Sequence, residues 1–163
     1  MINKYKINTG ASVKDYNKVS DWLSFEIPNK IKISSGKVDI GQHISTTLAL
    51  ICSRELGIDI NSIFVNKLTT DITPNEGITA SSLSVPNSGT AIRSASIIFK
   101  KNFLDFAAKS LNLNINNINL EDGVAKDPNS NASISFWDFS KTEEFLKLSI
   151  PEIIEIELSL IHI

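Results

Sequence analysis

Apolar and polar residues alternate twice within residues 31–40, first over residues 31–34 and again over residues 37–40. The small pair Ser35-Gly36 lies between the two runs. Alternation with a period of two places the apolar side chains on one face of a strand. Two such runs joined by a short turn are typical of a β-hairpin. The pattern therefore predicts a hairpin over residues 31–40.

Two later segments carry apolar residues at helical spacing. The first runs from Ile44 to Leu56, and Gly57 after it is a typical left-handed C-cap. The second runs from Ser88 to Leu111, and small residues near its start allow another element to approach closely. The apolar face of the first helix is predicted to comprise Leu48, Ile51, Cys52 and Leu56; that of the second comprises Ala91, Ala95, Ile98, Phe99, Phe103, Phe106 and Ala107.

Shorter signals complete the order of elements. Residues 63–68 and 118–120 are predicted strands, Asp122-Gly123 is a predicted turn, and residues 134–136 are a further candidate strand. The polar loop over residues 69–86 is long for a compact domain, and such loops are more often functional than idle. This order indicates an α/β (α+β) fold, with a mixed β-sheet and two packed helices.

The two ends of the chain differ in character from its middle. Residues 1–21 are polar without a sustained period and are interpreted as a flexible arm, so that the domain covers residues 22–157. Residues 158–163, Leu-Ser-Leu-Ile-His-Ile, resemble the translation of a transposase-end sequencing adapter. In that interpretation the natural sequence diverges near Glu157, and His162 has no chemical meaning. The alternative is a natural apolar edge strand.

Composition narrows the classes of function. The chain has 163 residues, 42% of them hydrophobic, and a net charge of −2, without the basic stripe that nucleic-acid binding requires. Its single cysteine, Cys52, excludes an internal disulfide and a CxxC motif, and its place on an apolar helix face favours a packing role. No run approaches the ~20 apolar residues of a membrane span. The expected location is the cytoplasm, with no nucleic-acid partner.

The common catalytic motifs are absent from the sequence. It contains no GxSxG, HExxH, GxGxxG or phosphate-binding P-loop sequence. Of the two histidines, one lies in the suspect tail, so a histidine-based site would depend on His43 alone. No metal site and no catalytic residue are expected from the residues themselves.

Order and spacing are more informative than any single motif. Gly36-Lys37-Val38-Asp39-Ile40-Gly41-Gln42 precedes the first helix, Thr79-Ala80-Ser81-Ser82 lies in the long loop, and Ser88-Gly89-Thr90-Ala91-Ile92-Arg93 opens the second helix. This series resembles the molybdopterin-binding large subunit of the xanthine dehydrogenase and aldehyde oxidase family. It is most similar to the isoquinoline 1-oxidoreductase or nicotinate dehydrogenase type. The resemblance extends from about Trp22 to Phe139.

The resemblance implies a set of cofactor-binding residues. Gly41 and Gln42 would contact the pterin, whose polar ring edge needs both amide donors and acceptors. The loop residues Ala80, Ser81, Ser82 and Ser84 would hold the pterin or its phosphates through hydroxyl and backbone N–H groups. Simpler interpretations stay open at this point. Gln42 could cap the first helix, and the serines could form an ordinary solvated loop. Arg93 is an exposed arginine of the first helical turn as readily as a phosphate ligand, and Glu76 is interpreted as a surface turn residue.

One position departs from the family pattern. Glycine typically follows the Gly-Gln pair, and His43 stands there in this chain. If the backbone needs positive φ at that position, a histidine is strained by ~1–3 kcal/mol. It also places an imidazole next to the cofactor.

The same resemblance implies a molybdenum hydroxylase, of which this chain is an N-terminal fragment. The expected cofactor is molybdopterin with molybdenum, as the cytosine dinucleotide, and the expected partners are the rest of the large subunit, a small iron–sulfur subunit and a small-molecule substrate. The substrate would be an N-heteroaromatic ring or an aldehyde, hydroxylated with oxygen from water. The family's catalytic glutamate, in a Gly-Glu motif near the far C-terminus, has no match here. Two alternatives remain: a stand-alone binding or assembly module, and an unrelated small enzyme.

Overall fold

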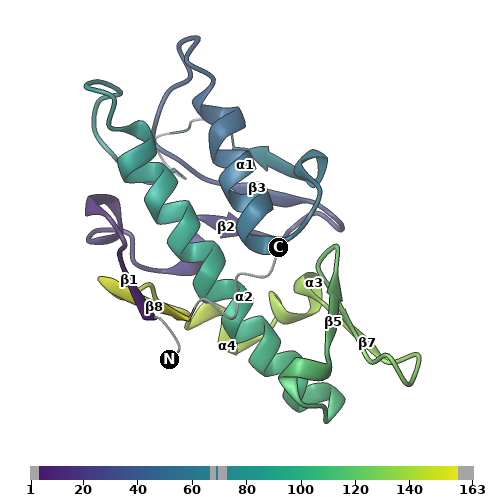
Figure 1. Ribbon diagram of the computed structural model, residues 1–163. Helices are drawn as coiled ribbons and strands as arrows, with labels where there is room; N and C mark the ends of the chain where they lie inside the picture. Colours follow the sequence, from purple (N-terminus) through teal and green to yellow (C-terminus); the bar gives the residue numbers. More distant parts are fainter. Residues whose placement is uncertain (1–3, 67–68, 70–72, 158–163) are drawn as a thin grey trace.

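The computed structural model describes residues 4–66, 69 and 73–157 (Figure 1). Within them, no helix has the length and apolar character needed to cross a membrane. In the labels, η marks a 3-10 helix, except that η4 is a π-helix. The elements are β1 (Lys4–Asn8), η1 (Ala11–Val13), η2 (Val19–Asp21), β2 (Leu23–Ser24), β3 (Ile31–Ile33), α1 (Ile44–Leu56), η3 (Ile60–Ser62), β4 (Ile63–Val65), η4 (Val85–Gly89), α2 (Thr90–Leu111), η5 (Ile115–Asn117), β5 (Asn119–Glu121), β6 (Val124–Lys126), β7 (Ser133–Ser135), α3 (Phe136–Phe139), α4 (Glu143–Leu146) and β8 (Ile153–Glu157).

The strands of the described part form small sheets around the two long helices. In the sheet ordered β2-β3-β4, β2 is antiparallel to β3 and β3 is parallel to β4. Parallel neighbours need a crossover connection, and α1 supplies it. The other sheets pair β1 with β8 and join β5, β6 and β7. The predicted class, a mixed β-structure with two packed helices, is confirmed.

The predicted hairpin over residues 31–40 is wrong. β3 forms as expected, but its antiparallel partner is β2, reached through the turn at Pro28-Asn29. Residues 38–40 are not in a strand. The cause lies elsewhere in the chain, because the backbone N–H groups of Gly36 and Val38 donate to side chains of residues 76 and 79 and do not pair with β3.

The two helices form where the spacing predicts them. α1 has the predicted bounds, and Gly57 after it has the expected left-handed φ of 73°. α2 begins at Thr90, two residues later than predicted, because residues 85–89 take the wider π-helical turn. A Cβ built on Gly89 would lie 3.2 Å from the Cδ1 atom of Ile51, so the end of one side chain of α1 packs closely on this glycine. Both helices begin at the upper end of the molecule in Figure 1.

A cluster of phenylalanine side chains fills the core beneath α2. Phe99, Phe103, Phe136 and Phe139 are fully buried. The ring of Phe99 stacks on that of Phe25 at a centroid distance of 4.5 Å and meets the edge of Phe136 at 5.0 Å. Because each ring buries a large apolar area, this cluster contributes strongly to the stability of the fold.

Residues 4–21 pack against the fold and do not form the expected flexible arm. β1 pairs with β8 in antiparallel register, from Lys4 opposite Glu157 to Asn8 opposite Ile153. Val19 is completely buried, and its backbone N–H donates to the carbonyl of Leu148 at 3.1 Å. The partners lie more than a hundred positions away in the sequence, so a local pattern could not reveal them.

The last third of the chain differs from expectation in detail. β5 and β7 lie close to the predicted strands, but β6 was not predicted, and Phe136 begins the short helix α3. Ser135 and Asp138 form a reciprocal capping box at the start of α3. Hydrogen bonds from the side chain and backbone of Ser135 lower the pKa of Asp138 below its ordinary value. The tail 158–163 and the end of the predicted strand 63–68 lie outside the described residues.

Candidate functional site

Two loops that lead into the long helices lie side by side. The first loop, residues 34–43, precedes α1; the second loop, residues 73–84, precedes η4 and α2. The backbone N–H of Val38 donates to the hydroxyl of Thr79 at 2.8 Å, and the Lys37 ammonium donates to the carbonyl of Ile78 at 3.0 Å. The structure therefore joins the two segments that carry the candidate cofactor-binding residues, although about forty positions separate them.

Gln42 lies on the surface of the first loop and holds the loop's own backbone. Its Oε1 accepts from the N–H of Ile40 at 2.6 Å, and its Nε2 donates to the carbonyl of Val38 at 2.8 Å. A glutamine side chain has two N–H donors and two acceptor lone pairs. One N–H and one lone pair therefore remain for a ligand. Gly41 next to it has a φ of 104°, and a Cβ there would meet nothing within 4 Å.

The alternative that Gln42 caps α1 is wrong, because Asp39 takes that role. Its carboxylate accepts from the backbone N–H of Gly41 and of His43, both at 3.2 Å, and of Ser45 at 3.3 Å. Desolvation raises the pKa of Asp39, but these hydrogen bonds outweigh it and leave that pKa below its ordinary value. Asp39 is therefore a residue that the sequence analysis missed; an aspartate five residues before the helix start was its only signal.

His43 has the left-handed backbone that the family pattern implied for a glycine. Its φ is 56° and its ψ is 33°, and its side chain is exposed. A residue with a Cβ pays for this conformation, so a local strain of ~1–3 kcal/mol is expected at this position. The hydrogen bonds to Asp39 before it and the first turn of α1 after it keep His43 in this conformation.

The serines of the second loop are presented to solvent. Ser81 and Ser82 are both exposed and both left-handed, with φ values of 56° and 57°. Two consecutive non-glycine residues in this region are uncommon and turn the chain sharply. Ala80 before them is exposed and Ser84 after them is half-buried. The N–H of Leu83 donates to the carbonyl of Ala80 at 3.2 Å and closes the turn.

Glu76 is not the surface turn residue that the sequence suggested. Its carboxylate accepts from the hydroxyl of Ser12 at 2.7 Å, from that of Ser88 at 2.7 Å and from the N–H of Gly36 at 2.8 Å. Ser88 is completely buried. These three partners come from three separate segments, so only the folded chain brings them to this carboxylate.

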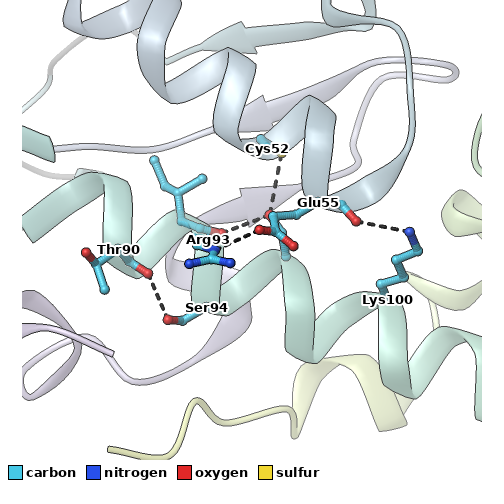
Figure 2. Close-up of polar contacts among 8 residues, drawn as sticks. Cys52, Glu55, Thr90, Arg93, Ser94 and Lys100 are labelled. Carbon is cyan, nitrogen blue, oxygen red and sulfur yellow. Dashed lines mark hydrogen bonds and ion pairs between the residues drawn. The ribbon is translucent and has the colours of Figure 1, made fainter. Parts of the chain in front are cut away.

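Arg93 pairs with α1 and is not directed at the two loops. Its Nε lies 2.7 Å from Oε1 of Glu55, and Figure 2 shows this ion pair between α1 and α2. The ammonium of Lys100 donates to the carbonyl of Glu55 at 3.1 Å on the same side of α1. Burial lowers the pKa of Lys100, and the charge of Glu55 opposes that effect. These contacts join the helices and leave Arg93 without the phosphate-binding geometry considered from the sequence.

Cys52 has the packing role that its position on the apolar face of α1 predicted. It is completely buried, with Sγ 3.7 Å from the hydroxyl of Ser96 on α2. Burial raises the pKa of the thiol to about 12. Because the thiolate is the nucleophilic form, this cysteine is chemically inert in the folded protein.

An open groove of about 520 Å³ runs beside the first loop. Its walls come from the first loop, from the beginning of α1 and from β4, and its lining residues include Lys37, Asp39, Ser45 and Asn66. Val38, Ala49, Ile63 and Val65 add apolar walls, and the six predicted cofactor-binding residues lie outside the groove's lining. Across the described ranges, no three His, Cys, Asp or Glu side chains gather in a way that could hold a metal ion.

Comparison with known proteins identifies relatives of this chain. Residues 1–155 match the family described as the molybdopterin cofactor-binding domain. Xanthine dehydrogenase of Calliphora vicina is 32% identical over 92 residues, which are 56% of this chain and 7% of that protein. Xanthine dehydrogenase/oxidase of Gallus gallus is 31% identical over 90 residues, covering 55% of this chain and 7% of the relative.

Solved structures of longer chains contain the same fold. A Cu,Mo-CO dehydrogenase in its carbon monoxide reduced state superimposes with a TM-score of 0.58 at 18% identity, covering 96% of this chain and 21% of that one. A reconstituted CO dehydrogenase from Oligotropha carboxidovorans gives a TM-score of 0.56 at 21% identity, covering 78% and 16% respectively. The chain thus spans only a small part of its relatives. Since the family match extends over nearly all of its residues, the chain belongs to the molybdopterin cofactor-binding domain family.

Proposed function

We propose that this chain holds the pterin cofactor of a molybdenum hydroxylase at its two joined loops. Gly41 and Gln42 of the first loop would contact the pterin ring, and Ala80, Ser81, Ser82 and Ser84 of the second would contact the pterin or its phosphates. The observation that carries the proposal is the hydrogen bond from Val38 to Thr79, which joins the two loops in a chain of this family.

The donor set of the two loops fits such a group. The exposed hydroxyls of Ser81 and Ser82 are suited to phosphate oxygens, and the unused N–H and lone pair of Gln42 are suited to the amide-like edge of a pterin. The cofactor, proposed as the cytosine dinucleotide, would supply the molybdenum centre at which the substrate is oxidised. The loops themselves would bind and orient it.

A complete enzyme needs more than this chain. The curated relatives described above are matched over only 7% of their length. We propose that the remainder of a large subunit, a small iron–sulfur subunit and a small N-heteroaromatic or aldehyde substrate complete the site, in the cytoplasm. Ile40 and Ile78, at the tips of the two loops, are 75% and 83% exposed, which is consistent with cover by the remainder of such a protein.

Replacing the two exposed serines tests the proposed function. Molybdopterin released anaerobically from a purified molybdenum enzyme is dialysed against the chain, and retention is followed by pterin fluorescence. The double variant Ser81→Ala/Ser82→Ala is expected to weaken retention about tenfold or more, because each hydrogen bond to a charged group contributes roughly 1.5–3 kcal/mol. Ser110→Ala, an exposed serine near the end of α2, serves as the matched control and should bind like the wild type. No retention by the wild type, or equal retention by both variants, would count against the proposal.

The chain by itself is expected to be inactive. It contains no Gly-Glu dipeptide to supply the family's catalytic base, and one cysteine cannot ligate an iron–sulfur cluster. Substrate-dependent dye reduction should therefore stay at the buffer level with the purified chain, with or without added cofactor. A measurable rate with either an N-heteroaromatic compound or an aldehyde would overturn this expectation.

A further inference from the structure

The carboxylate of Glu76 is a junction between three segments. Oε1 accepts from Ser12 at 2.7 Å and lies 2.8 Å from the hydroxyl of Ser88; Oε2 accepts from the N–H of Gly36 at 2.8 Å and lies 3.1 Å from the hydroxyl of Ser35. The three serines are buried or nearly so, with exposed fractions of 9%, 0% and 1% for Ser12, Ser88 and Ser35. Glu76 itself is half-buried, and four donors of the protein replace the water that its carboxylate loses.

A second set of contacts continues from the same residue along the second loop. The ammonium of Lys37, only 5% exposed, donates to the carbonyl of Glu76 at 2.7 Å and to that of Ile78 at 3.0 Å. Val38 then donates to the hydroxyl of Thr79. Residues 76, 78 and 79 of the second loop are therefore all hydrogen-bonded to Lys37 or Val38 of the first loop. We call Ser12, Ser35, Gly36, Lys37, Glu76 and Ser88 together the Glu76 clasp.

The clasp ends just before the strained part of the second loop. Ser81 and Ser82 are left-handed, and such residues persist only where the surrounding structure holds them. The segment is anchored on one side by the clasp and on the other by η4, which contains Ser88, itself a partner of Glu76. The Glu76 carboxylate therefore connects the start of the loop, at residue 76, with Ser88 at its far end.

We propose that Glu76 is a positioning residue, which through the clasp sets the path of residues 78–84 so that their hydroxyl and N–H groups face the cofactor. The assignment of the loop to cofactor binding rests on the proposed function. Glu76 is not a reacting group, since its oxygens are occupied by the hydroxyl and N–H donors of the protein. The ammonium of Lys37 is occupied by carbonyl oxygens in the same way and serves the loop, not a phosphate.

The substitution Glu76→Gln tests this assignment, because it keeps the size of the side chain and replaces one acceptor oxygen by a donor. The N–H of Gly36 needs the remaining amide oxygen, so the new NH2 group faces the hydroxyls of Ser12 and Ser88, which must turn to accept from it. The stronger hydrogen bonds that a charged carboxylate accepts are lost. We expect amide hydrogen exchange of residues 77–84 to accelerate at least tenfold, while the amides of residues 96–103 in α2 exchange as in the wild type. Molybdopterin retention per folded molecule, with the folded fraction taken from urea unfolding, should fall about tenfold.

The matched control is Glu55→Gln, which also removes one carboxylate but breaks the ion pair with Arg93 between the helices (Figure 2). It should change the exchange of residues 77–84 and the retention of molybdopterin by less than twofold. If Glu76→Gln does not fold, Ser12→Ala removes a single donor from the clasp and should give the same pattern at about threefold.

The possible failures can be told apart. Wild-type exchange and wild-type retention in Glu76→Gln would overturn the positioning role and leave the proposed function intact. Equal effects of Glu76→Gln and Glu55→Gln would overturn it too, because the effect would then be one of general stability. If the wild-type chain retains no molybdopterin, the proposed function fails, and the exchange comparison alone decides whether the clasp holds the loop.

Discussion

Replacing Phe99 by alanine is expected to destabilise the protein by about 3–5 kcal/mol, the range for truncating a buried aromatic residue. Its side chain is completely buried and lies at the centre of the aromatic cluster. The neighbouring ring centroids are at 4.5 Å for Phe25, 5.0 Å for Phe136 and 5.5 Å for Phe139. The substitution would leave a cavity where the ring of Phe99 was, and the surrounding aromatic side chains would have to move to fill it. Domains of this kind are stable by only about 5–15 kcal/mol, so the loss is a large fraction of the total.

Urea unfolding followed by circular dichroism measures this effect, with the slope of the transition compared between variants. Phe106→Ala is the matched control, because it removes the same side chain from the same helix at a half-buried position. It should cost roughly half as much, since less apolar area leaves water on folding. Equal midpoints for the two variants would show that the aromatic cluster is not the main support of α2.

Gly36→Ala is expected to destabilise the protein by about 1–3 kcal/mol, as overpacking does in a closely packed site. A Cβ at this position would collide with the backbone carbonyl of Pro74 and lie 2.9 Å from the backbone nitrogen of Glu76. Backbone atoms cannot rotate away as the end of a side chain can. The two loops would therefore have to separate, and the hydrogen bond from Gly36 to the Glu76 carboxylate would be lost with them.

Gly89→Ala is the control for that experiment. The nearest atoms to its added Cβ are Cδ1 of Ile51 at 3.2 Å and Cγ1 of Val85 at 3.3 Å, both ends of side chains that can shift. Its backbone is helical, where alanine is favoured over glycine by about 1 kcal/mol. The urea midpoint of this variant should stay close to that of the wild type. A larger loss for Gly89→Ala than for Gly36→Ala would contradict the close approach of the two loops.

The two helices were predictable because their signals are local. The 3.6-residue period of apolar positions and the glycine after Leu56 identify α1 to the residue, and α2 differs only where a π-helical turn delays its start. A helix that buries one face has apolar residues at this spacing, whatever other element it packs against. The glycine that the family places at position 43 raised positive φ there only as a condition, and the structure shows that His43 is left-handed.

The sheet pairings could not be read in this way. A period of two shows which residues can be in a strand but not which strand is the partner. Residues 38–40 alternate like a strand, yet the backbone N–H of Val38 donates to Thr79 of the second loop and that of Ile40 donates to Gln42. The pairing of β1 with β8 joins the two ends of the described chain, so residues 4–8 resembled a loose arm in sequence alone.

The sequence by itself determined the fold class, the two helices with their buried faces, the packing role of Cys52 and, through the order of its motifs, the family. Only the tertiary structure decided that the two loops lie side by side and that Asp39, not Gln42, caps α1. It also decided that the half-buried Glu76 accepts hydrogen bonds from the buried Ser12 and Ser88 and is not simply a surface turn residue. The physical reason is the range of the contacts. Helical periodicity acts within a few residues, whereas a carboxylate takes its donors from whatever segment the folded chain brings within about 3 Å.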